Sequence, residues 1–268
     1  MASGYVHGYT PREAERLHDQ AHTLRDLLHH DSIWPPGSRV LEVGTGVGAT
    51  TAIVSARNPA VRFISLDFAA ASLRQAAREL RAGGSANVAL LRGDGYRLPF
   101  ADGAFDHVFV CFLLEHLARP AAALAELRRV LKPGGTLTAV EGDHGSCYFH
   151  PETAAARAAW QCLIRAQAAL GGDSLIGRRL QPLLRAAGLR EVRVSPRMVY
   201  CDAARPEWQE GFVRRTIIPM VEGVREAALA SGTIDAATWA QGIADLHATG
   251  TVPDGVFCYT FFRATGFV

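Results

Sequence analysis

Short apolar segments alternate with amphipathic segments through the middle of the chain. The apolar segments predict strands at 40–43, 62–66, 88–91, 107–112 and 136–141. The amphipathic segments predict helices that run to Ala56, over 69–82 and over 121–131. A regular strand–helix–strand order predicts parallel strands with helices on both faces of the sheet. We therefore expect an α/β protein with a doubly wound, mostly parallel sheet.

The pattern changes at both ends of this region. Before it, apolar residues recur at three- and four-residue steps from Ala14 to Leu28, which predicts a helix that starts at Thr10 and Pro11, with Glu13 completing a capping box. After it, helical stretches are expected at 152–170 and 175–187, with two more helices between residues 202 and 253. Strands at 189–194 and 255–265 bring the expected total to seven, in a Rossmann-like sheet with a helical cap.

These breaks predict a division of the chain into core and cap segments. We expect an N-terminal arm and helix, a cofactor-binding core, a first helical insertion, a second helical insertion and the final core strands. Their ranges are 1–38, 39–142, 143–188, 201–254, and 189–200 with 255–268, respectively.

Composition and charge exclude several classes of partner. The 268 residues carry a formal net charge of +2 and show no concentrated basic face, which argues against a nucleic-acid partner. No apolar run approaches the ~20 residues of a membrane span. The five cysteines lack metal-ligand or disulfide spacing, which favours reduced thiols, no metal site and a cytoplasmic location. The N-terminus shows no signal-peptide pattern. The oligomeric state stays open between monomer and homodimer.

A glycine-rich turn joins the first predicted strand to the next helix. Gly44, Gly46 and Gly48 allow a tight turn and a close approach of the backbone to a ligand. The turn alone leaves two cofactors open, because Gly44, Gly46 and Ala49 also satisfy a dinucleotide-binding fingerprint with Asp67 at a suitable distance for a ribose.

Further motifs follow this turn in a fixed order. They are Val40 to Gly48, Ser65-Leu66-Asp67, Gly93-Asp94-Gly95 with Leu98-Pro99-Phe100, Phe105 to Val108, Leu114-Glu115-His116-Leu117, and Leu131 to Gly135. Over about 39–141 the chain resembles a class I S-adenosylmethionine-dependent methyltransferase, of the kind that includes the ubiquinone and menaquinone methylases. A dehydrogenase is not expected to carry the last three motifs.

The resemblance implies S-adenosyl-L-methionine as cofactor, S-adenosyl-L-homocysteine as product, and a set of cofactor-binding residues. That set is Glu42, Gly44, Thr45, Gly46, Gly48, Asp67, Phe68, Asp94, Gly95, Cys111 and Phe112. The glycine loop is expected under the methionine part, with Glu42 orienting the loop or meeting the ammonium. Asp67 is expected at the ribose hydroxyls, Phe68 on the adenine and Asp94 at its amino group. Structural alternatives are a helix cap for Asp67 and a turn for Asp94.

Candidate residues for the acceptor lie outside these motifs. Glu141, Asp143 and His144 follow the fifth predicted strand, at the edge where such folds bind ligands. His144 and His116 are candidate general bases, although methyl transfer needs a base only if the acceptor must lose a proton. Tyr5 and Tyr9, in the N-terminal arm, are candidate lid residues.

The sequence thus predicts an enzyme of the EC 2.1.1 class that transfers a methyl group to a small molecule, mainly by proximity and alignment. An NAD-dependent oxidoreductase and a non-enzymatic S-adenosylmethionine-binding regulator are the alternatives.

Overall fold

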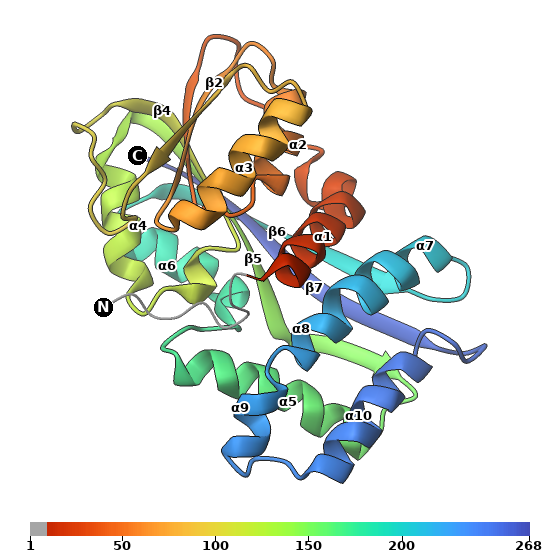
Figure 1. Cartoon of the computed structure of the whole chain (residues 1–268). Coiled ribbons are helices and arrows are strands. Elements are labelled where there is room, and N and C mark those ends of the chain that lie inside the picture. The colour runs from red at the N-terminus through yellow and green to blue at the C-terminus, as the bar shows by residue number, and fades with distance from the viewer. Residues whose placement is uncertain (1–9) are drawn as a thin grey trace.

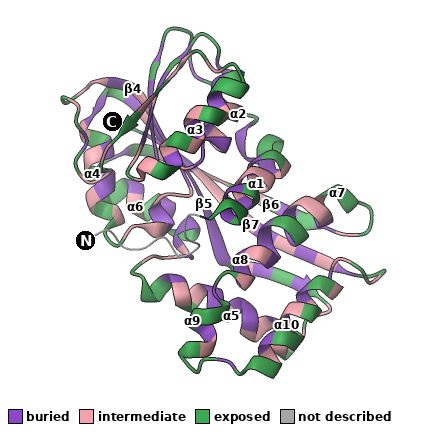
Figure 2. Cartoon of the chain, in the orientation of Figure 1, coloured by how far each residue is buried: buried purple, intermediate pink, exposed green. Residues whose placement is uncertain are grey.

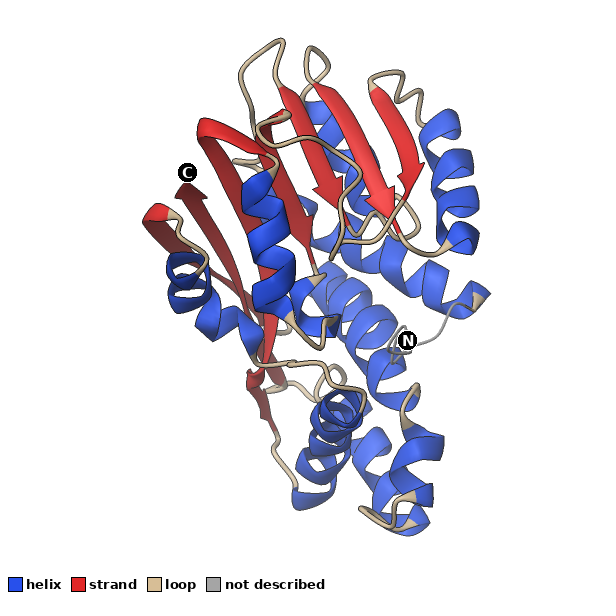
Figure 3. Ribbon diagram, turned by 90° about the vertical axis from the view of Figure 1, so that its left-hand side faces the viewer, coloured by secondary structure: helices blue, strands red, loops and turns tan. Residues whose placement is uncertain are grey.

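A single twisted sheet of seven strands forms the centre of the molecule (Figure 3). The computed structural model describes residues 10–268, so Tyr5 and Tyr9 lie outside the described residues. The strands are β1 Arg39–Val43, β2 Arg62–Asp67, β3 Val88–Arg92, β4 Phe105–Cys111, β5 Leu131–His150, β6 Arg190–Cys201 and β7 Val256–Phe267. Their spatial order is β3-β2-β1-β4-β5-β7-β6. Only β7 runs antiparallel to its neighbours, so the predicted doubly wound, mostly parallel sheet is confirmed.

Helices cover both faces of the sheet (Figure 1). The longer ones are α1 Pro11–His29, α2 Ala49–Arg57, α3 Ala70–Ala82, α4 Pro120–Arg129, α5 Ala154–Ala169 and α10 Ala236–Ala248. The shorter ones are η1 Leu114–His116, η2 Ile176–Arg179, α6 Leu180–Ala186, α7 Pro206–Trp208, the π-helix η3 Gln209–Ile217, α8 Ile218–Glu222 and α9 Arg225–Ala230. None of the described helices is both long and apolar enough to cross a bilayer.

Two hydrophobic cores hold these layers together. On one face, Leu124 and Leu127 of α4 join Leu180 and Leu184 of α6 against the strands. On the other face, α1 and the helices after β5 meet a group of aromatic side chains. This group includes Trp160, Phe212, Phe257 and Tyr259, all of them almost fully buried. Figure 2 shows that buried residues are concentrated along the central strands of the sheet.

β5 is much longer than the predicted strand at 136–141, and β6 extends past the predicted 189–194 to Cys201. The prediction stopped at Glu141 because the alternation of inward and outward residues is interrupted there. Five steps along β5, from Asp143 to Tyr148, correspond to two along β7, from Thr260 to Cys258. Such a β-bulge bends a strand without ending its pairing. Beyond it, Phe149 and Phe257 continue the buried face of the sheet.

The glycine turn after β1 brings α2 close to α3. Gly48 has a φ of +86°, and a Cβ atom on it would lie 2.9 Å from the Cα atom of Ala76 in α3. A side chain at this position would therefore suffer both a strained backbone and a steric clash.

We predict that Gly48→Ala lowers the free energy of unfolding more than Gly37→Ala does. Gly37 has a similar φ of +84°, but a Cβ atom added to it would meet no atom within 4 Å, so it measures the backbone strain alone. We expect ~1–2 kcal/mol for Gly37→Ala and a further ~1–3 kcal/mol for Gly48→Ala because of the forced contact. Urea unfolding of both variants measures the difference. Equal losses of unfolding free energy would show that α3 can accommodate a methyl group next to Ala76.

Candidate active site

A cavity of about 780 Å³ lies at the carboxyl ends of β1, β2 and β4. This volume is typical of small-molecule sites. One half is lined by the predicted glycine loop and the ends of β2 and β3, and the other half by α1, η3, α8, β5 and β7. The sheet edge therefore brings most of the predicted cofactor residues to one side of a single cavity.

Asp67 and the glycine loop form a connected unit on the first side. The backbone N–H of Gly46 donates to Oδ2 of Asp67 (2.8 Å), and the N–H of Ala69 donates to Oδ1 (2.8 Å). The buried hydroxyl of Thr45 has no partner among the described residues, although it belongs to the cavity wall. Asp67 thus fixes the loop, and its remaining lone pairs and the Thr45 hydroxyl can bind a polar ligand.

The adjacent strand ends contribute an aromatic face and a second carboxylate. Phe68 lines the cavity with an exposed ring, which is 55% accessible. Asp94 and Gly95 line it as well, and Oδ1 of Asp94 accepts the N–H of Tyr96 (2.9 Å). The turn expected as a structural alternative for Asp94 is present, and its carboxylate still faces the cavity.

Glu42, Cys111 and Phe112 close the floor of this half. Glu42 is buried and accepts a hydrogen bond from the Thr51 hydroxyl (2.7 Å), which ties the end of β1 to α2. Burial raises the pKa of Glu42 and also that of the Cys111 thiol. The Phe112 ring lies 5.5 Å from that of Phe261 in β7.

Gly48 is outside the cavity, unlike the other predicted loop residues. It is buried, and a side chain at this position would project onto Ala76 of α3. In this structure Gly48 has a packing role, and its predicted contact with the cofactor stays a prediction.

Glu141 and Asp143 also lie outside the cavity wall, in contrast to their prediction as substrate residues. Glu141 turns toward the segment after β4, where Oε1 accepts the N–H groups of Leu113 (3.1 Å) and Leu114 (2.7 Å). Asp143 is held in a bidentate ion pair by Arg178 at 2.6 and 2.7 Å. Both carboxylates are engaged by the protein and position the chain around the cavity, and their predicted contact with the substrate stays a prediction.

Polar residues of α1 form one wall of the second half. Arg16 is buried, and its guanidinium donates to both carboxylate oxygens of Glu13 at 2.7 Å. It also donates to Oε1 of Gln20 (2.8 Å), so the amide nitrogen of Gln20 points away from Arg16. All three residues line the cavity. The backbone N–H of Glu13 donates to Thr10 Oγ1, which is the N-cap bond of the predicted helix start.

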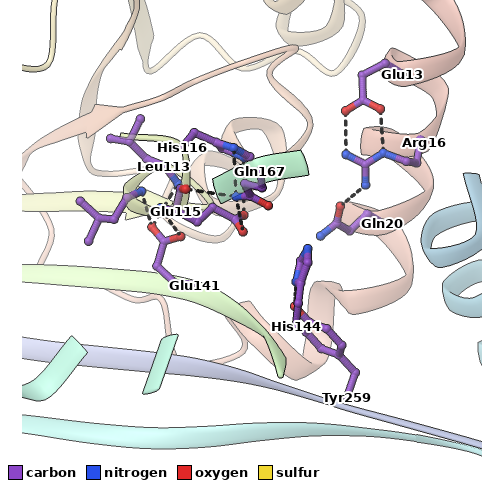
Figure 4. A network of polar contacts seen from close by, with 11 residues as sticks. Glu13, Arg16, Gln20, Leu113, Glu115, His116, Glu141, His144, Gln167 and Tyr259 are labelled. Carbon is purple, nitrogen blue, oxygen red and sulfur yellow. Dashed lines mark hydrogen bonds and ion pairs between the residues drawn. The ribbon is translucent and has the colours of Figure 1, made fainter. Parts of the chain in front are cut away.

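His116 and Glu115 lie next to this wall (Figure 4). Gln167 of α5 supports them: its Nε2 donates to the backbone oxygen of Glu115 (3.0 Å) and lies 3.4 Å from Nδ1 of His116. Burial, aided by Arg16, lowers the pKa of His116 to about 3, and burial raises the pKa of Glu115 to about 7. At neutral pH His116 is therefore uncharged.

His144 faces the cavity from the bulge of β5. Its Nδ1 lies 2.7 Å from the Tyr259 hydroxyl of β7, and its Nε2 is buried without a partner among the described residues. Burial, followed by the influence of His116 and Arg16, lowers the pKa of His144 to about 3. His144 is thus a neutral ring with one nitrogen held by the protein and one facing the cavity.

Several residues of this half were absent from the sequence prediction. They are Arg16, Gln20, Phe212, Tyr259 and Phe261. Tyr259 and Phe261 had a usable signal, because the alternation of the last strand places both on its inward face. Arg16 and Gln20 had none, since a polar position on an amphipathic helix is most often solvated.

A doubly wound sheet with a glycine loop and a carboxylate at neighbouring strand ends defines a nucleotide-cofactor-binding α/β protein. Comparison with known proteins narrows this class. Residues 41–139 match the family model described as a methyltransferase domain. A demethylmenaquinone methyltransferase of Corynebacterium kroppenstedtii is 35% identical over 147 residues, or 49% of this chain and 60% of the relative.

Two further proteins extend the comparison. A ubiquinone/menaquinone biosynthesis C-methyltransferase of Paracoccus denitrificans is 32% identical over 150 residues, or 52% of this chain and 59% of the relative. The chain thus spans less than two thirds of these curated relatives. The crystal structure of the YcgJ protein of Bacillus subtilis has a TM-score of 0.60 at 18% identity, with 92% of this chain and 98% of that chain covered.

Together these matches confirm the resemblance predicted from the sequence. The chain resembles class I S-adenosylmethionine-dependent methyltransferases of the ubiquinone and menaquinone methylase type, for which S-adenosylmethionine is the cofactor. The matched region holds the glycine loop, Asp67, Asp94, Glu115 and His116, and it includes neither α1 nor His144 and the elements after it that line the second half of the cavity.

We predict that Gly46→Val weakens binding of S-adenosylhomocysteine at least tenfold while the protein stays folded. Gly46 lines the cavity, and a Cβ on it meets no atom within 4 Å, so a valine would project into the ligand space. Gly84→Val is the matched control, because Gly84 also has a positive φ (+69°) and open space but lies outside the cavity. Calorimetry and thermal melting of both variants provide the test. Unchanged affinity of a folded Gly46→Val protein would contradict the assignment of the loop.

Proposed function

We propose that this protein is an enzyme that transfers the methyl group of S-adenosylmethionine to a small-molecule acceptor. The observation that carries the proposal is the cavity itself. Its first half joins the glycine loop, Asp67 and Asp94 of the matched methyltransferase region, and its second half, which we call the chamber, adds α1, η3, α8 and β7 from outside that region. A binding module would need only the first half.

The described residues fit this cofactor. The remaining lone pairs of the Asp67 carboxylate would accept hydrogen bonds from the ribose hydroxyls. Phe68 would pack on the adenine, and Asp94 would accept a hydrogen bond from the adenine amino group. The glycine loop, the unpartnered Thr45 hydroxyl and Glu42 would surround the methionine part, with Cys111 and Phe112 as walls. When bound, S-adenosylmethionine supplies a methyl group on a positively charged sulfur whose leaving group is neutral.

The chamber would act mainly by holding the acceptor in line with the cofactor. Alignment of this kind accounts for a large part of the barrier in bimolecular reactions. Phe212, Ile217, Met220 and Phe261 give the chamber an apolar wall, which would exclude water. His116 and His144 face it as neutral rings, so both remain candidates for contact with the acceptor.

We also propose the predicted division of labour along the chain. Segments 1–38, 143–188 and 201–254 would form the acceptor cap over the core, and residues 39–142 would bind the cofactor. The position of α1 and η3 in the second half of the cavity supports this division. The N-terminal arm with Tyr5 and Tyr9 would act as a lid.

The cellular setting belongs to the same proposal. All five cysteines are free thiols, which fits a reducing compartment such as the cytoplasm. We propose that the enzyme works there as a monomer or homodimer on a small molecule, without nucleic acid.

Equilibrium binding tests the cofactor directly. We expect S-adenosylhomocysteine to bind in calorimetry and NAD to bind at least a hundredfold more weakly. Preferential binding of NAD would overturn the proposal in favour of an oxidoreductase. Transfer of labelled methyl groups to a panel of small acceptors then separates an enzyme from a cofactor-binding regulator, which would bind but never transfer.

We predict that Asp67→Ala weakens S-adenosylhomocysteine binding by ~1.5–3 kcal/mol, because two charge-assisted hydrogen bonds are lost. Asp67→Asn keeps the side-chain shape and one acceptor oxygen, so a smaller loss is expected. Calorimetry measures both affinities. Asp67→Ala also removes the hydrogen bonds from Gly46 and Ala69, so thermal melting checks whether the loss of affinity comes from a destabilised loop. Undiminished affinity of Asp67→Ala would remove Asp67 from the cofactor site.

A further inference from the structure

His144 is held more rigidly than a wall residue of a chamber requires. Its backbone N–H donates to the oxygen of Ser174 (2.9 Å), and its own carbonyl accepts the indole N–H of Trp160 (2.8 Å). Its ring centroid lies 5.6 Å from that of Trp160 and 5.8 Å from that of Tyr259, and the residue is only 5% exposed. The direction of its free nitrogen is therefore fixed.

The Tyr259 hydroxyl determines which ring nitrogen of His144 carries the proton. That hydroxyl lies 2.7 Å from Nδ1 of His144. Among the described residues, Nδ1 is the hydrogen-bond acceptor within reach of its single hydrogen. If Nδ1 were itself a donor, both the hydrogen of this fully buried phenol and the lone pair of Nε2 would lack a partner among the described residues, whereas with Nδ1 as acceptor only the N–H of Nε2 does, so the second arrangement costs less.

A glycine makes this contact possible. A Cβ atom at position 142 would lie 2.4 Å from the Tyr259 hydroxyl oxygen, so only Gly142 lets the phenol reach Nδ1. With Nδ1 as acceptor, the neutral ring carries its proton on Nε2, which is buried at the cavity without a partner among the described residues. The lowered pKa of His144, about 3, is consistent with a neutral ring at physiological pH.

Gln20 supplies a second donor on the opposite wall. Arg16 donates to its Oε1 (2.8 Å), which fixes the orientation of the amide and directs its NH2 group away from Arg16. Figure 4 shows this end of Gln20 facing the ring of His144. The two side chains therefore present two N–H donors to the same part of the cavity, each oriented by a partner behind it.

We propose that Gln20 and His144 form an oxygen-binding site for the methyl acceptor, in which His144 is a hydrogen-bond donor and not a general base. The acceptor is an apolar molecule with a carbonyl or ionised hydroxyl oxygen near the methylated atom. A protonated amine is excluded at this position because an ammonium group offers only donors. This inference rests on the proposed function, and it names the substrate class of the same chamber.

The tautomer of His144 is measured without any acceptor. Long-range proton–nitrogen NMR correlations of the full-length protein with 15N-labelled histidine distinguish a protonated Nε2 from a bare one, and His144→Gln assigns the signals. We expect a single Nε2–H form in the wild type and a mixture in Tyr259→Phe. A bare Nε2 in the wild type overturns the inference, and an unchanged tautomer in Tyr259→Phe overturns the role of Tyr259.

Matched probes then test the site. The protein is saturated with S-adenosylhomocysteine, and binding of acetophenone and of benzylamine is followed by NMR titration. We expect acetophenone to bind and to shift the His144 signals, and benzylamine to bind at least tenfold more weakly.

Variants separate a donor from a base. His144→Gln, whose amide N–H can replace Nε2–H, is expected to keep acetophenone affinity within about threefold. His144→Leu and Gln20→Leu are each expected to lose about tenfold. Unchanged acetophenone binding in both leucine variants, or tighter binding of benzylamine than of acetophenone, overturns the oxygen-binding site.

The first step of the same experiment isolates the proposed function. If S-adenosylhomocysteine fails to bind, the methyltransferase assignment is wrong, whatever the tautomer of His144. If it binds while Nε2 is bare, only the inference about the acceptor is wrong.

Discussion

Pairing between β5 and β7 is the constraint on which the rest of the structure depends. It runs from Thr136 opposite Phe267 to His150 opposite Val256, so it spans both the core of the sheet and the region beneath the cap helices. Its one irregularity, between Asp143 and Tyr148, lies where the strand passes the cavity. Bulges commonly redirect a side chain next to a functional site. Here the irregularity places His144 against Tyr259, whose position is set by the partner strand.

The electrostatics of the second half of the cavity, and of Glu141 next to it in β5, follow from burial. Desolvation raises the pKa values of Glu115 and Glu141 and lowers those of His116 and His144. Both effects favour uncharged forms. The buried cation Arg16 is matched by Glu13 in a bidentate pair. A chamber of this kind orients a ligand by hydrogen bonds and shape, with little net charge to attract an ionic one.

The glycine-loop half of the cavity could be predicted from the sequence because its signals are local. A short apolar strand, a glycine turn and a carboxylate at the next strand end lie within thirty residues of one another, and the parallel sheet brings such ends together. The acceptor half depends on distant pairings. Glu141 and Asp143 had the right position in the chain, but their side chains turn to the Leu113 backbone and to Arg178. The spacing of residues in the sequence does not reveal that Glu141 contacts the Leu113 backbone or that Asp143 pairs with Arg178. Arg16, Gln20 and Tyr259 come from opposite ends of the chain, and no local pattern links them.

The place of β7 in the sheet has a consequence for how the protein folds. β1 to β4 associate through neighbouring βαβ units, whereas β7 inserts between β5 and β6 only after the intervening helices have been synthesised. His144 and Tyr259 are 115 residues apart. Pairings across such separations close large loops and tend to form late. The half proposed to bind the cofactor therefore has the contacts to assemble first, and the half proposed to bind the acceptor is completed by the last strand to join. Errors in the insertion of that strand would yield a protein in which the glycine-loop half of the cavity is formed and the opposite half is not.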